Sequence, residues 1–124
     1  GPYALQAAIA ALHASAATAA ATDWPQIAML FGELQTRQPT PVIALNRAVA
    51  IAMAHDIAQG LTLVDQLAAE LVDYHLWHAA RADLLRRLDR RVEATAAYER
   101  ALALAGSEPE RRFLQRRIDT LSTR

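Results

Sequence analysis

Alanine and leucine, which both favour helices, dominate the apolar positions of the chain, and no stretch has the pattern of a convincing strand. Short polar stretches with prolines and capping residues separate the apolar runs, as expected at helix boundaries. Uniform lengths and short loops predict that consecutive helices pack as antiparallel hairpins. The predicted helices, about seven, cover residues 3–20, 24–37, 41–55, 57–71, 74–88, 91–105 and 108–121.

Four residues mark predicted helix ends. Asp23 and Thr40 are predicted N-caps, each followed by a proline in the first helical turn, where the missing N–H costs little. Ser107 is the predicted N-cap of the last helix, and Gly106 the predicted C-terminal cap of the helix before it.

The turns also repeat. Asp23, Asp56 and Asp89 are 33 residues apart, and each precedes the second helix of a predicted pair. A period near 34 residues with two helices per repeat is the tetratricopeptide signature, so we expect an all-α, tetratricopeptide-like fold forming a short right-handed solenoid. Small or aromatic residues are expected where paired helices approach closely: Gly60 in the second repeat, and Ala82, Ala94, Tyr98 and Ala101 in the third.

Composition and charge narrow the picture. At 124 residues and 53% hydrophobic, the chain (1–124) is one domain or a fragment of a larger protein, and it can bury a real core. Lys+Arg and Asp+Glu balance at 13 each, so no global field attracts nucleic acid or an anionic membrane. The first half is nearly chargeless, which suggests burial on more than one side. Its charged residues up to position 62 are Asp23, Glu33, Arg37, Arg47 and Asp56.

Several kinds of site are excluded or disfavoured. The chain has no cysteine, which rules out disulfides, thiolate metal sites and cysteine nucleophiles. The alanine-rich segment 4–21 has no basic region before it and is interrupted by polar residues, so we interpret it as a soluble amphipathic helix. No glycine-rich phosphate loop, nucleophile elbow or His-Glu metal motif occurs, and no cofactor is expected. The aromatic residues are expected in the core: Trp24, Phe31, Trp77, Tyr98 and Phe113.

Asn46 and Arg47 lie together in the apolar stretch "TPVIALNRAVAIAMAH". They fall on a first helix of a pair, and such helices line the concave surface where solenoids usually bind peptides. The alternative is structural: Arg47 pairs with a carboxylate of the neighbouring repeat, for which Asp83 is our candidate, and fixes the register. We favour the structural interpretation, and both remain open.

Two further clusters contain side chains that could bind a metal ion or a partner. His75 and His78 share a helix face and could ligate one metal ion, although packing and capping are the commoner roles of such a pair. Asp83, Arg86 and Arg87 belong to a basic run interleaved with acidic residues, which predicts ion pairs within a solvated helix and no direct nucleic-acid contact. Asn46, Arg47, Asp83, Arg86 and Arg87 are nevertheless the candidates for partner contact.

Five segments together resemble the C-terminal, tetratricopeptide-like extension of a group of bacterial extracytoplasmic-function RNA polymerase sigma factors. They are "GPYALQAAIAALHA", "DWPQIAMLFGEL", "PTPVIALNRAVAIAMA", "YHLWHAARADLLRRLDR" and "AYERALALAGSEPERRFLQRRI". The resemblance covers essentially the whole chain and implies that Gly1-Pro2 is native, where the alternative is a cleavage scar. One departure is Asp89, where relatives tend to have glycine in the turn; we expect this to matter little.

The resemblance implies a non-catalytic regulatory module of transcription initiation, acting in the cytoplasm. Its partners would be the upstream sigma regions of the same chain and, through them, core RNA polymerase, or a signalling protein. Neither direct nucleic-acid contact nor a membrane is expected for this part. Two alternatives stay open: a free-standing tetratricopeptide adaptor that binds a partner peptide, and a small metal-binding or enzymatic domain that uses His75 and His78.

Overall fold

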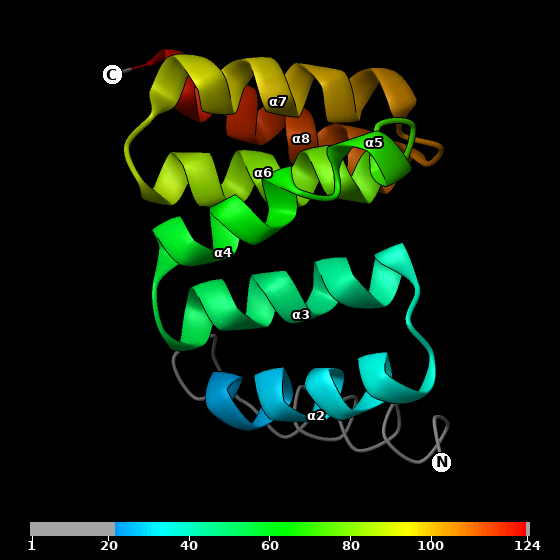
Figure 1. Cartoon of the computed structure of the whole chain (residues 1–124). Coiled ribbons are helices and arrows are strands. Elements are labelled where there is room, and N and C mark those ends of the chain that lie inside the picture. Colours follow the sequence, from blue (N-terminus) through cyan, green and yellow to red (C-terminus); the bar gives the residue numbers. More distant parts are fainter. Residues whose placement is uncertain (1–21, 124) are drawn as a thin grey trace. The chain divides into compact units, whose positions relative to one another are not determined.

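The computed structural model describes residues 22–123. Over this range the chain forms seven α-helices, labelled α2 to α8, and no strand (Figure 1). The helices belong to two compact units, the first ending at Leu63 and the second beginning at Val64. The all-α prediction is therefore confirmed for the described residues, and the predicted helix 3–20 lies outside them.

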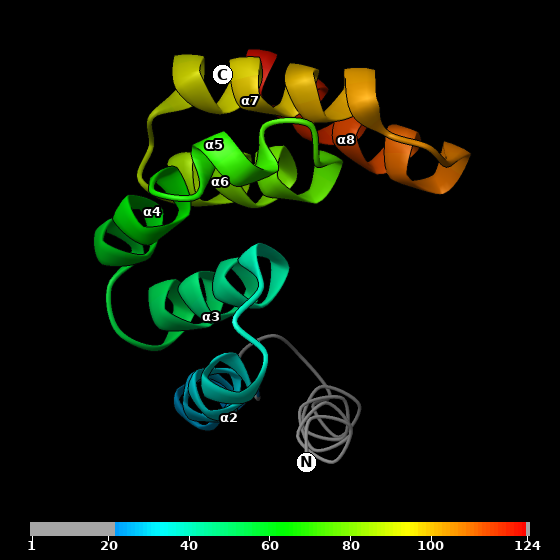
Figure 2. The same ribbon diagram turned by 45° about the vertical axis from the view of Figure 1, so that its right-hand side comes forward.

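The first unit contains the pair α2 (Trp24–Arg37) and α3 (Pro41–Ala54), which run side by side in opposite directions (Figures 1 and 2). Both predicted N-caps are confirmed. Asp23 Oδ1 accepts from the backbone N–H of Gln26 at 3.2 Å, and Thr40 Oγ1 accepts from that of Ile43 at 3.2 Å. Each cap satisfies a backbone donor that the first turn of a helix leaves unpaired.

Four residues form the buried centre of this pair: Ile27 and Ala28 on α2, and Ala50 and Ile51 on α3. Each helix thus contributes one small and one branched side chain to the cluster, a combination that suits close helix packing. Partly buried apolar side chains cover this centre: Trp24, Leu30, Phe31 and Leu63.

Helix α4 (Ile57–Asp65) approaches α3 at Gly60. A Cβ added to Gly60 would contact the Cβ of Ala52 and lie 2.7 Å from Ala52 Cα and 2.9 Å from the carbonyl oxygen of Ala48. Backbone atoms of α3 thus occupy the space that a side chain would need. The predicted requirement for a very small residue at position 60 is confirmed.

The single predicted helix 57–71 is wrong. Helix α4 ends at Asp65, and a separate short helix, α5, covers Ala68–Leu71. The cause lies at the carbonyl of Val64, which would accept from residue 68 in a continuous helix. It accepts instead from the backbone N–H of Leu67 at 3.0 Å and from the indole Nε1–H of Trp77 at 2.9 Å. The hydrogen bond from Trp77 therefore stabilises the end of α4 and replaces the bond that would continue the helix.

The second unit is built on the pair α6 (His75–Arg87) and α7 (Arg91–Leu104). The repeat pattern predicts small or aromatic residues where these two helices meet, and the residues at the predicted positions are buried. The buried residues at this contact include Ala82 on α6 and Ala94, Ala97, Tyr98 and Ala101 on α7.

The turn between α6 and α7 has a defined geometry around Asp89, whose φ is 59°. The N–H of Arg90 donates to the carbonyl of Leu85 at 2.9 Å, and the N–H of Asp89 donates to that of Arg86 at 3.0 Å. These two bonds are the Schellman motif, in which the residue after the helix adopts the left-handed conformation that glycine favours. Asp89 therefore stands where a glycine would fit without strain.

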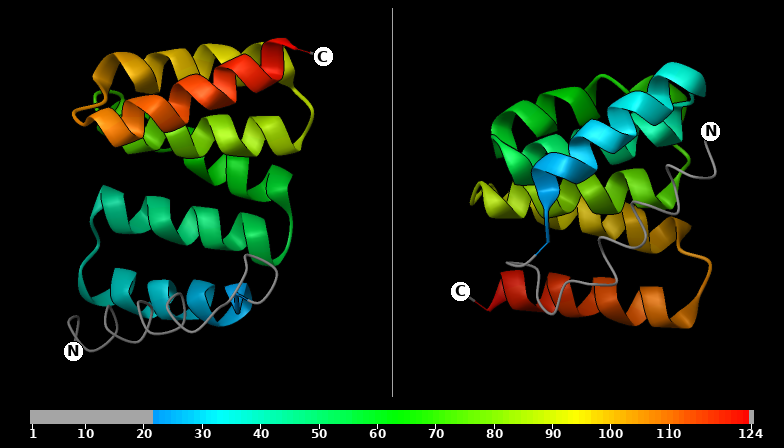
Figure 3. Two further views of the ribbon diagram at one scale, coloured as in Figure 1. Left: turned by 180° about the vertical axis from the view of Figure 1, so that it is seen from behind. Right: turned by 90° about the horizontal axis from the view of Figure 1, so that it is seen from below.

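Helix α8 (Glu108–Ser122) follows α7 after a short loop and packs beside it (Figure 3). The predicted cap is confirmed, because Ser107 Oγ accepts from the N–H of Glu110 at 3.3 Å. The predicted role of Gly106 is wrong. The residue that ends α7 is Ala105, with φ −66° and ψ 136°, and Gly106 does not have positive φ. An extended exit from the helix replaces the left-handed cap.

The prediction that the aromatic residues lie in the core is correct for Trp77 and Tyr98 but not for Phe113. Trp77 and Tyr98 are buried, at 6% and 1% exposure, as expected. Phe113 was expected in the core but is 44% exposed, because its neighbour Leu114 takes the inward position on α8. The guanidinium carbon of Arg117 lies 5.3 Å from the centre of the Phe113 ring, so a cation–π contact covers part of it.

Candidate partner-binding site

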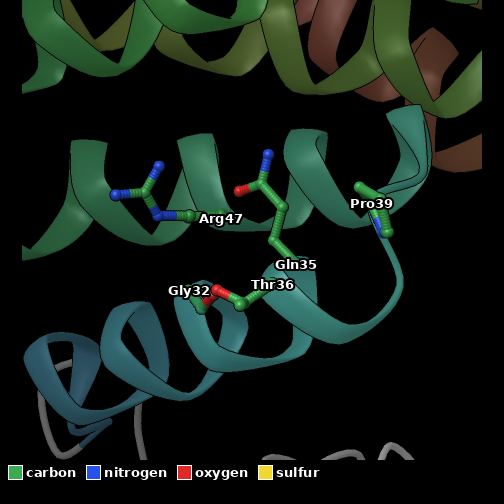
Figure 4. A pocket seen from close by; sticks show the side chains of 5 residues that line it. All are labelled: Gly32, Gln35, Thr36, Pro39 and Arg47. Atoms are coloured by element: carbon green, nitrogen blue, oxygen red, sulfur yellow. The ribbon is translucent and has the colours of Figure 1, made fainter.

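Arg47 lies half-buried on α3, opposite Gly32 of α2 (Figure 4). A Cβ added to Gly32 would lie 3.5 Å from Arg47 Nε, which is ordinary van der Waals contact. Any longer side chain at position 32 would compete with the guanidinium for the same space. The absence of a side chain at Gly32 therefore leaves space for the guanidinium of Arg47.

Two hollows meet at Arg47. The first has a volume of about 530 Å³ and is lined by Gly32, Gln35, Thr36, Pro39 and Arg47 (Figure 4). The second has a volume of about 350 Å³ and is lined by Pro25, Ala28, Met29, Arg47, Ile51, His55 and Gln59. Because Arg47 lines both, we treat these residues as one surface and call it the Arg47 groove.

Helical spacing explains how the groove forms. Arg47 and Ile51 are four residues apart and so share one face of α3, and His55 follows at the same spacing as the residue that ends the helix. The α2 residues in the lining run from Pro25 to Thr36, which at 1.5 Å per residue is about 16 Å of helix. Since α2 and α3 are antiparallel, the start of α2 lies beside the end of α3, and Arg47 stands between the two hollows.

Arg47 forms no ion pair with a described residue of its own unit. The carboxylates there serve other positions or face solvent: Asp23 caps α2, Asp56 accepts from the N–H of Ala58 at 3.1 Å, and Glu33 is exposed. Residues 1–21 contain no aspartate or glutamate at all. The guanidinium thus lies in a groove without a neutralising acid from the first half of the sequence.

Asn46 does not share this position. It is exposed on α3 and lines neither hollow. Adjacent residues on a helix point about 100° apart, so the two side chains that stand together in the sequence face different directions. The structure therefore brings Arg47, but not Asn46, into the groove.

The cluster of Asp83, Arg86 and Arg87 is an ion-pair network within α6. Asp83 Oδ1 binds Arg86 at 2.6 Å, and its Oδ2 binds Arg87 at 2.8 Å. Burial alone would raise the pKa of the Asp83 carboxyl, but hydrogen bonds from Arg87 and Arg86 outweigh it and hold the pKa below its ordinary value. Both oxygens of Asp83 therefore bind arginines one turn away on α6. The pairing of Asp83 with Arg47 stays a prediction.

The two histidines have different partners. His75 Nδ1 lies 2.5 Å from Glu110 Oε2, which joins α6 to the first turn of α8. His78 is buried, and its Nε2–H donates to the carbonyl of Val72 at 2.6 Å. Although three residues apart on one helix, the rings therefore serve separate contacts. Over residues 22–123, no three histidine or acidic side chains gather as a metal site would need.

Sequence reasoning missed the groove walls. The available signal was Gly32, a glycine in the interior of the predicted helix 24–37, where it costs stability relative to alanine without an obvious reason. The spacing of Arg47, Ile51 and His55 was a second signal. Neither showed that α2 and α3 would pair along these faces. Arg81 belongs to the basic run for which ion pairs within the helix are predicted, but it binds Asp65 at 2.8 Å and so joins α6 to the end of α4.

Comparison with known proteins adds one finding. No family model matches the chain. An uncharacterized protein of Rhizobium meliloti (strain 1021) is 42% identical over 122 residues, which are 98% of this chain and 29% of the relative. The chain thus spans less than a third of the curated relative that it matches. No helix in the described part of the chain is long and apolar enough to cross a membrane.

Proposed function

We propose that the chain is a non-catalytic protein-interaction and regulatory domain built from tetratricopeptide-like helical hairpins. The α6–α7 hairpin and the close approach of α4 to α3 at Gly60 support this architecture. In the proposed repeat, α2 and α3 belong to successive hairpins, and their contact joins one repeat to the next. The recurrence of Asp23, Asp56 and Asp89 before α2, α4 and α7 supports a repeat. Such repeats stack into a short right-handed solenoid whose surfaces bind segments of other proteins.

One observation carries the interaction function: the Arg47 groove. An arginine without a carboxylate partner in its own unit stands between two hollows on the face of a helical pair. Structural arginines are normally paired when they leave water, because an unpaired buried charge is costly. A partner that supplies the missing acid upon binding accounts for this arrangement.

The protein in which this domain acts is, in our proposal, a bacterial sigma factor of the extracytoplasmic-function group. The support is the resemblance of five segments that together cover essentially the whole chain. A relative more than three times as long as the matched region fits a domain within a longer protein. The proposed partners are then the sigma regions and, through them, core RNA polymerase, or a signalling protein, all in the cytoplasm.

The test uses the complete gene product. The sigma regions and residues 1–124 are produced as separate chains and co-purified at several salt concentrations, and transcription by polymerase is measured with the intact and the truncated protein. We expect co-purification and an altered transcription rate. A gene without sigma regions, or no association under any condition, would favour the alternative of a free-standing adaptor that binds an unrelated peptide.

A further inference from the structure

We infer that the Arg47 groove binds an extended segment of a partner protein in which an aspartate or glutamate stands next to an apolar residue. This rests on the proposed interaction function and deepens it, because it names the chemistry of the segment.

The charge of the groove determines the first requirement. A guanidinium presents five N–H donors in a planar fork that matches a carboxylate. No acidic residue lines either hollow, and residues 1–63 hold only Asp23, Glu33 and Asp56. Two of these three carboxylates accept backbone hydrogen bonds at helix starts. The complementary negative group must therefore come from outside this part of the chain.

The walls of the groove determine the second requirement. Met29 is 60% exposed, and it lines the second hollow together with Ala28 and Ile51. An exposed methionine adapts its shape to apolar side chains of a partner. The first hollow is more polar, because Gln35 and Thr36 line it, so apolar contact is expected on one side of Arg47. The single permanent cation favours a carboxylate on a peptide over a phosphate, which carries more charge and is usually held by several cations.

The length of the groove determines the form of the segment. The α2 wall extends over about 16 Å. An extended peptide advances about 3.3 Å per residue, so the groove accommodates about five residues with the acidic one at the centre. Its central position matches that of Arg47, which lines both hollows.

The experiment uses two synthetic peptides: acetyl-Ala-Leu-Glu-Leu-Ala-amide, and the same peptide with glutamine in place of glutamate (the glutamine twin). Blocking both ends leaves the glutamate as the only charge. Each peptide, and separately inorganic phosphate, is titrated into the isotopically labelled chain, and NMR follows the backbone amides of the groove and the Nε–H of Arg47. We expect the glutamate peptide to shift groove signals and the glutamine twin to bind about fivefold more weakly or worse.

Three variants locate the effect. Arg47→Leu should weaken binding of the glutamate peptide until it equals that of the glutamine peptide. Gly32→Leu fills the first hollow but keeps the charge, so it should weaken binding of both peptides. Arg37→Leu is the matched control, because Arg37 is exposed at the end of α2 and lines neither hollow, and it should change nothing.

Each other outcome overturns the inference. Equal binding of both peptides removes the requirement for an acid, and no shift with either removes the peptide site. If phosphate shifts the Arg47 Nε–H signal as strongly as the glutamate peptide does, the groove is a simple anion site. The proposed function is judged separately: if the Arg47→Leu domain still co-purifies with the sigma regions, this inference fails while the interaction function stands.

Discussion

Gly60 of α4 lies so close to Ala52 of α3 that a Cβ on the glycine would be 2.7 Å from the alanine Cα. Gly32 of α2 is also helical, but its added Cβ would meet only Arg47 Nε, at 3.5 Å. The same substitution at the two glycines should therefore act in opposite directions. Helix propensity favours alanine over glycine by about 1 kcal/mol at both, and steric overlap opposes it at one.

We predict that Gly60→Ala lowers the free energy of unfolding by about 1–2 kcal/mol and that Gly32→Ala raises it by about 0.5–1 kcal/mol. Urea titration monitored by circular dichroism measures both. A stabilising Gly60→Ala would mean that α3 and α4 are not in contact at this point.

Asp89 gives a second prediction. Its φ of 59° is the left-handed conformation, which strains a residue with a Cβ and suits glycine. Asp89→Gly should raise stability by about 0.5–1 kcal/mol, and Asp89→Val should lower it by at least as much. Thermal unfolding of the two variants, beside wild type, provides the check. If the valine variant is as stable as the glycine variant, the turn does not have this geometry.

The pH dependence of stability should report on Asp83. Its folded-state pKa is held below the ordinary value of 3.8, because hydrogen bonds from Arg87 and Arg86 outweigh the opposing effect of burial. A depressed folded pKa gives stability that is complete above the unfolded pKa and is lost as pH falls through the folded one. Wild type should therefore exceed Asp83→Asn by a constant amount, about 1 kcal/mol, above pH 5, and the difference should shrink below about pH 4. A difference that persists unchanged to pH 2 would contradict the ion-pair network.

The contact of His75 Nδ1 with Glu110 Oε2, at 2.5 Å, should couple α6 to α8. We predict a coupling free energy of about 0.5–1.5 kcal/mol in a double-mutant cycle of His75→Ala and Glu110→Gln. Glu108, which lies in the same first turn of α8 but has its side chain 75% exposed, provides the control pair with His75 and should give almost none. Equal coupling free energies in both cycles would show that any acidic residue in the first turn of α8 has this effect, and would contradict a specific contact with Glu110.

Local chemistry made much of the fold predictable. Asp23, Thr40 and Ser107 were recognisable as caps because capping depends on a side chain and the backbone three residues later. What the sequence could not show depends on distant partners. The break after α4 requires the Trp77 indole to reach the Val64 carbonyl, 13 residues away, and no local rule predicts that contact.

The candidate site shows the same division. That Arg47 is unusual followed from its apolar surroundings in the sequence. Its separation from Asn46 follows from helix geometry, since adjacent residues point about 100° apart. Its place opposite Gly32 follows from how α2 packs on α3, which the sequence pattern left open. The sequence also left open which groups bind Asp83, and in the structure Arg86 and Arg87, one turn along α6, bind that carboxylate.

The central claim is that Arg47 is a recognition residue rather than a structural one, and the free energy of unfolding of Arg47→Leu tests it most directly. Leucine keeps the apolar packing of the arginine stem and removes the charge, with no ion pair lost from its own unit. We predict a value within about 0.5 kcal/mol of wild type, or slightly above it. A loss of about 2 kcal/mol or more would show that Arg47 holds the fold together, and would contradict the account.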